Sequence, residues 1–307
     1  MEEYPRTLGE LERQFSTEES CRQYLFRLRW PQGYQCPRCE KQKAWKERAG
    51  AGLFRCAACG YKTSMTAGTI FARTRKPLVL WFRTIWWVCA QKNGASAQTV
   101  QRILGLGSYE TAWVWLQKLR RAMVRPGRDR LSGMVEVDET YVGGYRSGKR
   151  GRGAEGKTLV VIAVQLEEQR IGRIRLLRVS DASAQSLERA TQATIELGSK
   201  VRTDGWNGYN GLQRLGYPHE VVRKEGIVGE NLLPHCHQVA SLLKRWLLGT
   251  HQGAVRTQHL GYYLDEYTFR FNRRTSLSRG KLFYRLLQQA MATKAVTYEQ
   301  LTKKRKS

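Results

Sequence analysis

Four of the seven cysteines in this 307-residue chain form two Cys-x-x-Cys pairs, and this is the most specific motif in the sequence. The pairs are Cys36–Cys39 and Cys56–Cys59, with residues 40–55 between them. Two such pairs at this spacing predict a structural four-thiolate zinc site of the ribbon type, in which the intervening segment forms short hairpin strands. The other cysteines lack such a partner, and we expect them to pack as small apolar groups: Cys21, Cys89 and Cys236.

The charge of the chain is strongly unbalanced. Lysine and arginine number 53 against 26 acidic residues, which gives a formal net charge of +27. Such an excess, together with nine tryptophans, fourteen tyrosines and eight phenylalanines, predicts a polyanionic partner. Nucleic acid is the first candidate and an anionic membrane surface is the second. The hydrophobic content of 41% suffices for a packed core, so overall disorder is excluded.

The ends and the apolar segments bear on location. No stretch approaches the ~18 uninterrupted apolar residues of a membrane span. The acidic N-terminus, residues 1–5, lacks the apolar core of a signal peptide. We therefore expect a cytoplasmic protein, in a reducing compartment where cysteines ligate metal in preference to forming disulfides.

Apolar residues at helical spacing predict several helices before residue 125. Residues 1 to about 30 look helical, and further helices are expected over 78–92, 97–104 and 109–123. The last of these has apolar residues on one side and basic residues on the other: Lys118, Arg120, Arg121 and Arg125. A helix, a short helix, a glycine turn and a basic helix outline a helix-turn-helix. The alternative is a plain helical linker, and the charge favours DNA binding.

Residues 134–144 combine a strand pattern with acidic side chains. Valines and a tyrosine alternate with polar residues at period two up to Gly143 and Gly144, which predicts a strand. Glu136 and Asp138 would share one face of it. Two carboxylates on one strand face are costly to bury without a cation, and a divalent metal would supply that cation. The alternative is a solvated edge strand.

The following segments complete a sheet. Strands are expected over 158–165 and 171–179, a helix over 183–197, and a short strand from 200 that delivers Asp204 at its end. Three strands, a helix and a fourth strand, with acids in the first and after the fourth, match the layout of a ribonuclease-H-like core. By itself, Asp204-Gly205 is more often a turn. The basic, glycine-rich residues 143–157 predict a loop.

A later helix carries the third candidate ligand. Residues 236–248 form an amphipathic pattern in which His237 and Lys244 lie two turns apart, so both can face one site. A lone histidine on a helix is usually a polar surface group, but this one follows Asp204 at the distance at which the core layout needs a ligand. Glu230 and Glu266 are alternatives for the third position.

At this point the sequence resembles the transposases of IS1595-type, ISXO2-like bacterial insertion sequences. The matching motifs occur in order along nearly the whole chain, from the zinc ribbon onward: Val135–Gly144, Thr203–Gly205, Leu242–Arg245, Gly249–Thr250 and Tyr263–Arg274. Many relatives have Glu or Asn as the third ligand. Some members are described by an Asp-Asp-His pattern, which the histidine at 237 fits.

The resemblance implies an α/β fold, with a ribonuclease-H-like catalytic core preceded by a small zinc ribbon and a helical helix-turn-helix domain. It implies DNA cleavage and strand transfer at a two-metal site of Mg²⁺ or Mn²⁺ held by Asp138, Asp204 and His237, with Lys244 near the phosphate. It also implies a bacterial, nucleoid-associated protein acting on double-stranded DNA as at least a homodimer. Basic residues would hold flanking phosphates: Lys118, Arg120, Arg121, Arg270, Arg273 and Arg274.

Five domains or segments are expected: an N-terminal helical segment 1–30, a zinc ribbon 31–75, a helix-turn-helix 76–126, a catalytic domain 134–275, and a basic C-terminal helix and tail 276–307. Two hypotheses from other classes stand beside the transposase. One is a non-catalytic or decayed zinc-ribbon and helix-turn-helix DNA-binding protein. The other is a ribonuclease-H-like hydrolase that acts on RNA hybrids or junctions.

Overall fold

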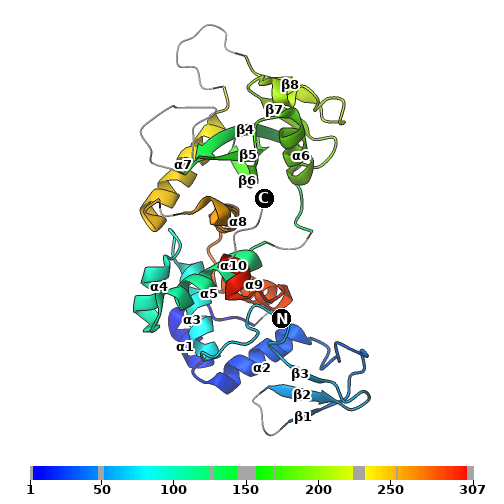
Figure 1. The fold of residues 1–307 in the computed structure, drawn as a ribbon, viewed down its shortest axis with the longest axis vertical. Coiled ribbons are helices and arrows are strands. Elements are labelled where there is room, and N and C mark those ends of the chain that lie inside the picture. The colour runs from blue at the N-terminus through cyan, green and yellow to red at the C-terminus, as the bar shows by residue number, and fades with distance from the viewer. Residues whose placement is uncertain are drawn as a thin grey trace. The chain divides into compact units, whose positions relative to one another are not determined.

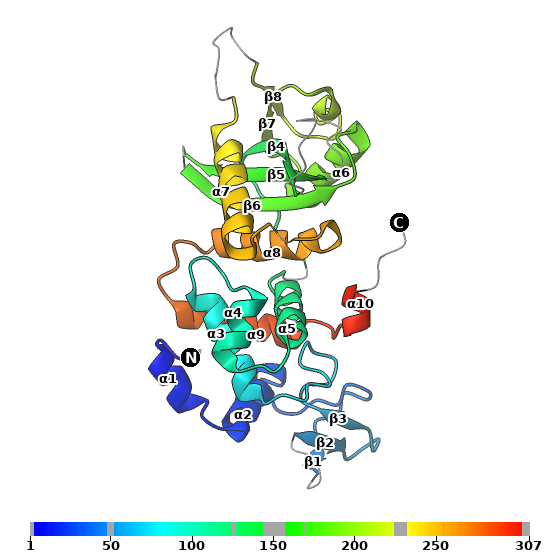
Figure 2. The same ribbon diagram turned by 60° about the vertical axis from the view of Figure 1, so that its left-hand side comes forward.

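The computed structural model describes residues 3–47, 52–124, 127–143, 157–168, 170–223, 232–253 and 255–302 (Figures 1 and 2). The chain divides into two compact units. Unit 1 comprises Met1–Arg125 with Ser276–Lys304, and unit 2 comprises Pro126–Thr275 with the last three residues. Among the described helices, none combines the length and the apolar character that crossing a bilayer requires.

Unit 1 is helical, with one small antiparallel sheet in the order β1-β2-β3. Its described elements are α1 (Leu8–Gln14), α2 (Glu18–Arg29), β1 (Ala44–Lys46), β2 (Leu53–Cys56), β3 (Lys62–Ser64), α3 (Leu78–Ala90), α4 (Ala97–Leu104), α5 (Tyr109–Ala122), α9 (Arg279–Ala292) and α10 (Tyr298–Thr302). The predicted N-terminal helical segment is two helices, because Thr17 and Ser20 form a capping box that starts α2 afresh.

The core of unit 1 is aromatic and joins the two ends of the sequence. Trp81 and Phe82 of α3 are fully buried. Trp81 stacks on Trp115 of α5 with ring centroids 4.0 Å apart, and Phe82 packs against Phe283 of α9 at 5.7 Å. Burial of such large rings is a main stabilising contribution in a small domain. It explains why α9, which follows unit 2 in the sequence, belongs to the N-terminal unit.

The three helices predicted as a helix-turn-helix form with nearly the expected bounds. Ser96 accepts a hydrogen bond from the N–H of Thr99, and Ser108 accepts one from the N–H of Glu110, both at 3.1 Å, so each serine caps its helix. The expected basic face of α5 is wrong at Arg120, whose side chain is 1% exposed.

Unit 2 is built on a five-stranded mixed sheet in the order β6-β5-β4-β7-β8. β4 pairs antiparallel with β5 and β5 with β6, whereas β4 with β7 and β7 with β8 are parallel. The described elements are β4 (Met134–Val142), β5 (Thr158–Glu167), β6 (Arg170–Val179), α6 (Ala184–Thr194), β7 (Lys200–Thr203), β8 (His219–Val221), α7 (Pro234–His251) and α8 (Leu260–Phe271), with 3-10 turns at Asn207–Tyr209 and Thr257–His259.

The two faces of this sheet have separate cores. Val135 and Val137 of β4 lie on one face, in a cluster with Leu187 of α6. Ile162 of β5 lies on the opposite face, in a cluster with Val239 of α7 and residues of α8. Because strand side chains alternate between faces, the even-numbered residues of β4, including both predicted acids, point to the α7 side.

The predicted elements of unit 2 are present, with shifted ends. The helix predicted over 183–197 ends at Thr194, because Ile195 is extended and bridges Leu131. The helix predicted over 236–248 extends from Pro234 to His251. The predicted basic loop lies almost wholly outside the described residues, as do Arg125 and Glu230.

The end of α8 covers the edge strand β6. The Asn272 side-chain carbonyl accepts the N–H of Ile174 at 2.7 Å, and its amide donates to the Ile174 carbonyl at 3.0 Å. Arg274 donates to the carbonyls of Gly172, at 3.1 Å, and of Ile171. These side chains satisfy backbone groups that an edge strand leaves open. The Phe-Arg-Phe-Asn-Arg-Arg motif therefore contributes to the structure of unit 2.

Candidate active site

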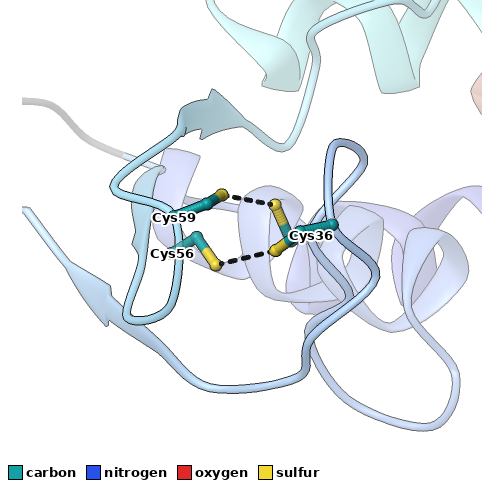
Figure 3. Close-up of side chains that lie close together, drawn as sticks. Cys36, Cys56 and Cys59 are labelled. Carbon is teal, nitrogen blue, oxygen red and sulfur yellow. Dashed lines mark hydrogen bonds between the residues drawn. The ribbon is translucent and has the colours of Figure 1, made fainter.

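The four paired cysteines converge in the N-terminal ribbon, as the spacing predicts. Their sulfurs all lie within 4.8 Å of one another, with Cys36 and Cys59 3.7 Å apart and Cys39 and Cys56 3.5 Å apart (Figure 3). Tetrahedral zinc, with Zn–S bonds of about 2.3 Å, places its sulfurs about 3.8 Å apart. The donor set and its spacing therefore fit structural zinc.

The two Cys-x-x-Cys turns have the same backbone geometry. The N–H of Glu40 donates to the carbonyl of Cys36 at 2.9 Å, and the N–H of Gly60 donates to that of Cys56 at 3.0 Å. Both donors adopt positive φ, 61° and 68°. Burial raises the pKa of the Cys36 thiol, but nearby N–H groups outweigh it and lower the pKa to about 6. A thiol that ionises readily is suited to binding metal.

The ribbon is held against α2. Trp30 packs edge-on against Phe54 of β2 at 5.5 Å, and Tyr34 stacks on the same ring at 5.7 Å. Arg29 donates to the Ala67 carbonyl at 2.7 Å, and also to Ser64 and Met65. Aromatic packing and the hydrogen bonds of the Arg29 guanidinium to three carbonyls therefore hold the ribbon in place.

In unit 2, the fold brings together two of the predicted catalytic residues that are ninety-nine positions apart. His237 Nε2 in the first turn of α7 lies 3.2 Å from Asp138 Oδ2 on β4. The Asp138 side chain is 16% exposed and that of His237 is 52% exposed. The pair thus lies at the boundary between the core and solvent. This position is accessible to a substrate.

The surroundings of Asp138 disfavour a bare negative charge. Burial raises the pKa of this carboxyl to about 6, and the charges of Glu139 and Asp204 act in the same direction. His237 and the Glu139 N–H, which donates to Asp138 Oδ1 at 2.8 Å, act in the opposite direction. A partly buried carboxylate among other acids is stabilised by a cation.

Asp204 lies directly after β7, where the prediction places it. It begins a turn, because its Oδ1 accepts the N–H of Trp206 at 3.1 Å and Gly205 has φ 83°. The strand-end and turn interpretations are therefore both correct. In the described part of the chain, only the four cysteines form a group of three or more ligand atoms within 4.8 Å. Asp204 is thus close enough for its charge to raise the pKa of Asp138, but it does not join Asp138 and His237 in such a compact group.

Lys244 follows His237 by two turns of α7 and is exposed. Partial desolvation by the surrounding protein lowers the pKa of its ammonium group and Lys157 lowers it further, while Asp138 raises it. Lys244 therefore lies within electrostatic reach of Asp138, on the side of α7 predicted from the spacing.

Glu136 has a role that the sequence analysis did not predict. It shares a face of β4 with Asp138, as expected, but it is fully buried. Its carboxylate accepts the backbone N–H groups of His235, at 3.2 Å, and Cys236, at 3.3 Å. The signal that points to this role is Pro234 at the start of a helix without its own side-chain cap.

Glu266 lies in a separate ion pair. Its side chain is 1% exposed, and Glu266 Oε1 lies 2.8 Å from Arg270 Nη2 within α8. On the other face of β4, the Tyr209 hydroxyl donates to Glu139 at 2.9 Å. Neither contact includes Asp138 or His237.

The basic residues assigned to DNA differ in their surroundings. Arg120 is buried, so it cannot reach a phosphate, and that assignment is corrected. Lys118 and Arg121 of α5 are partly exposed. Arg270 pairs with Glu266, and the Arg273 guanidinium stacks over Phe269 at 4.2 Å. These side chains, like that of Arg274, therefore have partners within the protein, and their positions can be explained without a contact to DNA.

Comparisons with known proteins match two segments of the chain, one in each unit. Residues 16–62 match the family of the transposase zinc-ribbon domain. Residues 130–272 match the family of the ISXO2-like transposase domain. A search of curated proteins found no matching relative. The first match contains all four cysteines, and the second contains Asp138, Asp204, His237 and Lys244. The chain therefore carries both a zinc-ribbon domain and an ISXO2-like transposase domain, the domains of IS1595-type transposases.

Proposed function

We propose that this transposase binds the ends of an insertion sequence and carries out DNA cleavage and strand transfer that depend on Mg²⁺ or Mn²⁺. The observation that carries the proposal is the 3.2 Å contact between Asp138 and His237. Asp204 is close enough to raise the pKa of Asp138, and Asp138 is close enough to raise the pKa of Lys244. A carboxylate, an imidazole and a second carboxylate around a half-open position form a reasonable ligand set for divalent metal.

The sheet supports a ribonuclease-H-like assignment of unit 2. In chain order its strands are arranged third, second, first, fourth, fifth, with the first three antiparallel and the last two parallel to the first. One acid lies on the central strand and the next follows the strand beside it. This arrangement brings residues that are distant in sequence to one region of the sheet.

We assign these residues to a pair of divalent ions. Two divalent ions about 3.5–4 Å apart, when bound, stabilise the attacking and leaving oxygens of a phosphodiester. Ligands of different ions lie further apart than ligands of one ion, which accounts for Asp204 standing outside a compact group. Asp138 would contact both ions, Asp204 one and His237 the other.

The protein's own groups would bind and orient the DNA. Lys244 carries a point charge on the face of α7 that also bears His237, so it would hold a phosphate next to the metal ligands. The net charge of +27 supplies sequence-independent attraction for double-stranded DNA. The helix-turn-helix and the ribbon would contact the element ends, and synapsis of two ends calls for at least a homodimer.

The test is cleavage of a DNA fragment that carries both ends of the element, with Mg²⁺ or Mn²⁺. Asp138→Ala and Asp204→Ala are expected to abolish cleavage and joining while DNA binding is retained. Glu196→Ala is the matched control, because Glu196 is an exposed acid that precedes β7, whereas Asp204 follows it. Cleavage by the Asp138→Ala protein at the wild-type rate would contradict the proposal.

A joining assay with pre-cut ends separates strand transfer from hydrolysis. The transposase joins the 3′ end to a target, whereas a ribonuclease-H-like hydrolase does not. The non-catalytic alternative has one observation in its favour, the position of Asp204 outside a compact ligand group. It predicts that the wild-type protein binds the ends and leaves them intact with either metal.

A further inference from the structure

Glu136 is a fully buried acid that has no role in the proposed DNA cleavage and strand transfer. It lies two residues before Asp138 and on the same face of β4. A buried carboxylate is costly unless other groups compensate its charge. Its partners come from two other elements: the start of α7 and Arg202 of β7, whose Nη1 lies 3.9 Å from Oε1.

The start of α7 lacks a cap of its own. The N-cap residue, Leu233, makes no side-chain hydrogen bond, Pro234 follows it, and the first turn contains no acidic residue. The N–H groups of a first helical turn need acceptors from outside the helix. Glu136 Oε2 accepts two of them, those of His235 and Cys236, while Oε1 lies 2.9 Å from His235 Nδ1. The strand thus supplies the missing cap, and its charge suits the positive end of the helix.

The same two elements meet again at the metal ligands. The N–H of Cys236 donates a hydrogen bond to Glu136. His237, which follows Cys236 in the chain, contacts Asp138, which follows Glu136 on the same face of β4. Fixing the backbone of the first turn fixes both the height and the rotation of α7 against β4. The His237 ring is then directed at Asp138.

We propose that Glu136 is a positioning residue for the metal site: it caps α7 from β4 and thereby holds His237 against Asp138. Through Arg202, it also links to β7, the strand that ends at Asp204, so a single carboxylate connects the three elements that carry the ligands. Arg202 is itself held by Glu220 of β8 at 3.0 Å. This inference rests on the proposed role of His237 as a metal ligand.

The test uses the full-length, zinc-loaded protein with Mn²⁺ as the probe. Electron spin-echo spectroscopy of bound Mn²⁺ detects coupling to the ¹⁴N of a histidine ligand. Wild type is expected to show this coupling and His237→Ala to lack it. Glu136→Ala is expected to lose it and to bind Mn²⁺ about 10–100-fold more weakly, the range seen when residues that orient metal ligands are removed. Glu220→Ala, which removes the other acid bonded to Arg202, is expected to keep it.

Two conservative variants separate positioning from stability. Glu136→Gln keeps an acceptor at the same reach and is expected to retain the coupling. Glu136→Asp keeps the charge but withdraws it by about one C–C bond, roughly 1.5 Å, and is expected to lose the coupling. These two variants decide the matter if Glu136→Ala does not fold.

The outcomes distinguish two failures. Coupling that is absent from wild type, or that persists in His237→Ala, would overturn the assignment of His237 and this inference with it. Coupling that is present in wild type, lost in His237→Ala and unchanged in folded Glu136→Ala, or in Glu136→Asp, would overturn the positioning role alone and leave the proposed function standing.

Discussion

The two candidate metal centres are built in opposite ways. The four cysteines lie within residues 36–59, and their geometry comes from two local turns with the same hydrogen-bond pattern. The acidic centre combines Asp138 with His237, and the contact depends on how α7 packs on β4. The first centre contains its whole ligand set in one short segment. The proposed ligands of the second come from distant segments and meet only where α7 packs on β4.

This difference sets what each centre should do when it is disturbed. Loss of a ligand from the ribbon removes a main source of that domain's stability, because structural zinc contributes folding free energy directly. Loss of a proposed ligand from the acidic centre is expected to remove the proposed catalysis and, by relieving charge repulsion, to stabilise the fold. The following predictions test that contrast, in decreasing order of effect.

Cys36→Ser is expected to have the largest effect. Binding of structural zinc is worth roughly 10–16 kcal/mol in small zinc domains, so the ribbon should release its metal and unfold. Zinc content by mass spectrometry, together with hydrogen exchange of the β2 amides, measures this. Mn²⁺ binding to unit 2 should persist. A fully folded ribbon without zinc would contradict the account.

Asn272→Leu is expected to destabilise unit 2 by about 2–6 kcal/mol, because it leaves both the N–H and the carbonyl of Ile174 without their partner and each unmade buried hydrogen bond costs about 1–3 kcal/mol. Urea unfolding monitored by exchange of the β6 amides measures this change. Asn272→Asp is the control: it keeps the acceptor for the Ile174 N–H and should lose only part of the stability. Zinc binding by unit 1 should be unaffected by either variant.

Asp138→Asn is expected to stabilise unit 2 at pH 8 by about 1–3 kcal/mol, in the absence of added Mg²⁺ or Mn²⁺. The folded-state pKa of about 6 lies above the ordinary value of 3.8, so ionisation opposes folding. The cost is absent below pH 4, grows between pH 4 and 6, and is complete above pH 6. Denaturant unfolding at pH 4 and pH 8 compares the variant with wild type. An equal effect at both pH values would contradict the assigned cause.

Arg121→Ala is expected to have the smallest effect. If this partly exposed side chain contacts a phosphate, its loss should lower the slope of log K against log salt for DNA binding by about 1. Arg120→Ala is the matched comparison: the buried side chain should affect stability and leave the salt slope unchanged. Equal slopes for wild type and Arg121→Ala would remove this helix face from the DNA interface.

Much of the fold could be predicted because its signals are local. Period-two alternation identified β4, apolar residues at helical spacing identified α4 and α5, and cysteine spacing identified the ribbon. The roles of Glu136, Asn272 and Arg120 depend on packing between distant segments. The sequence alone suggested a metal face for Glu136 and a basic DNA-binding surface for Arg120, and it suggested no role for Asn272 itself. Glu136 and Asn272 form their hydrogen bonds with backbone groups of the protein itself, and Arg120 is buried inside it.

The central claim is that Asp138 and His237 hold a divalent metal, and crystals grown with Mn²⁺ test it most directly. Zinc at the four cysteines provides an internal reference, because it gives an anomalous peak in the same data. The account predicts a manganese peak at coordination distance, roughly 2.0–2.3 Å, from both Asp138 Oδ2 and His237 Nε2. A clear zinc peak with no manganese peak beside Asp138 would contradict it.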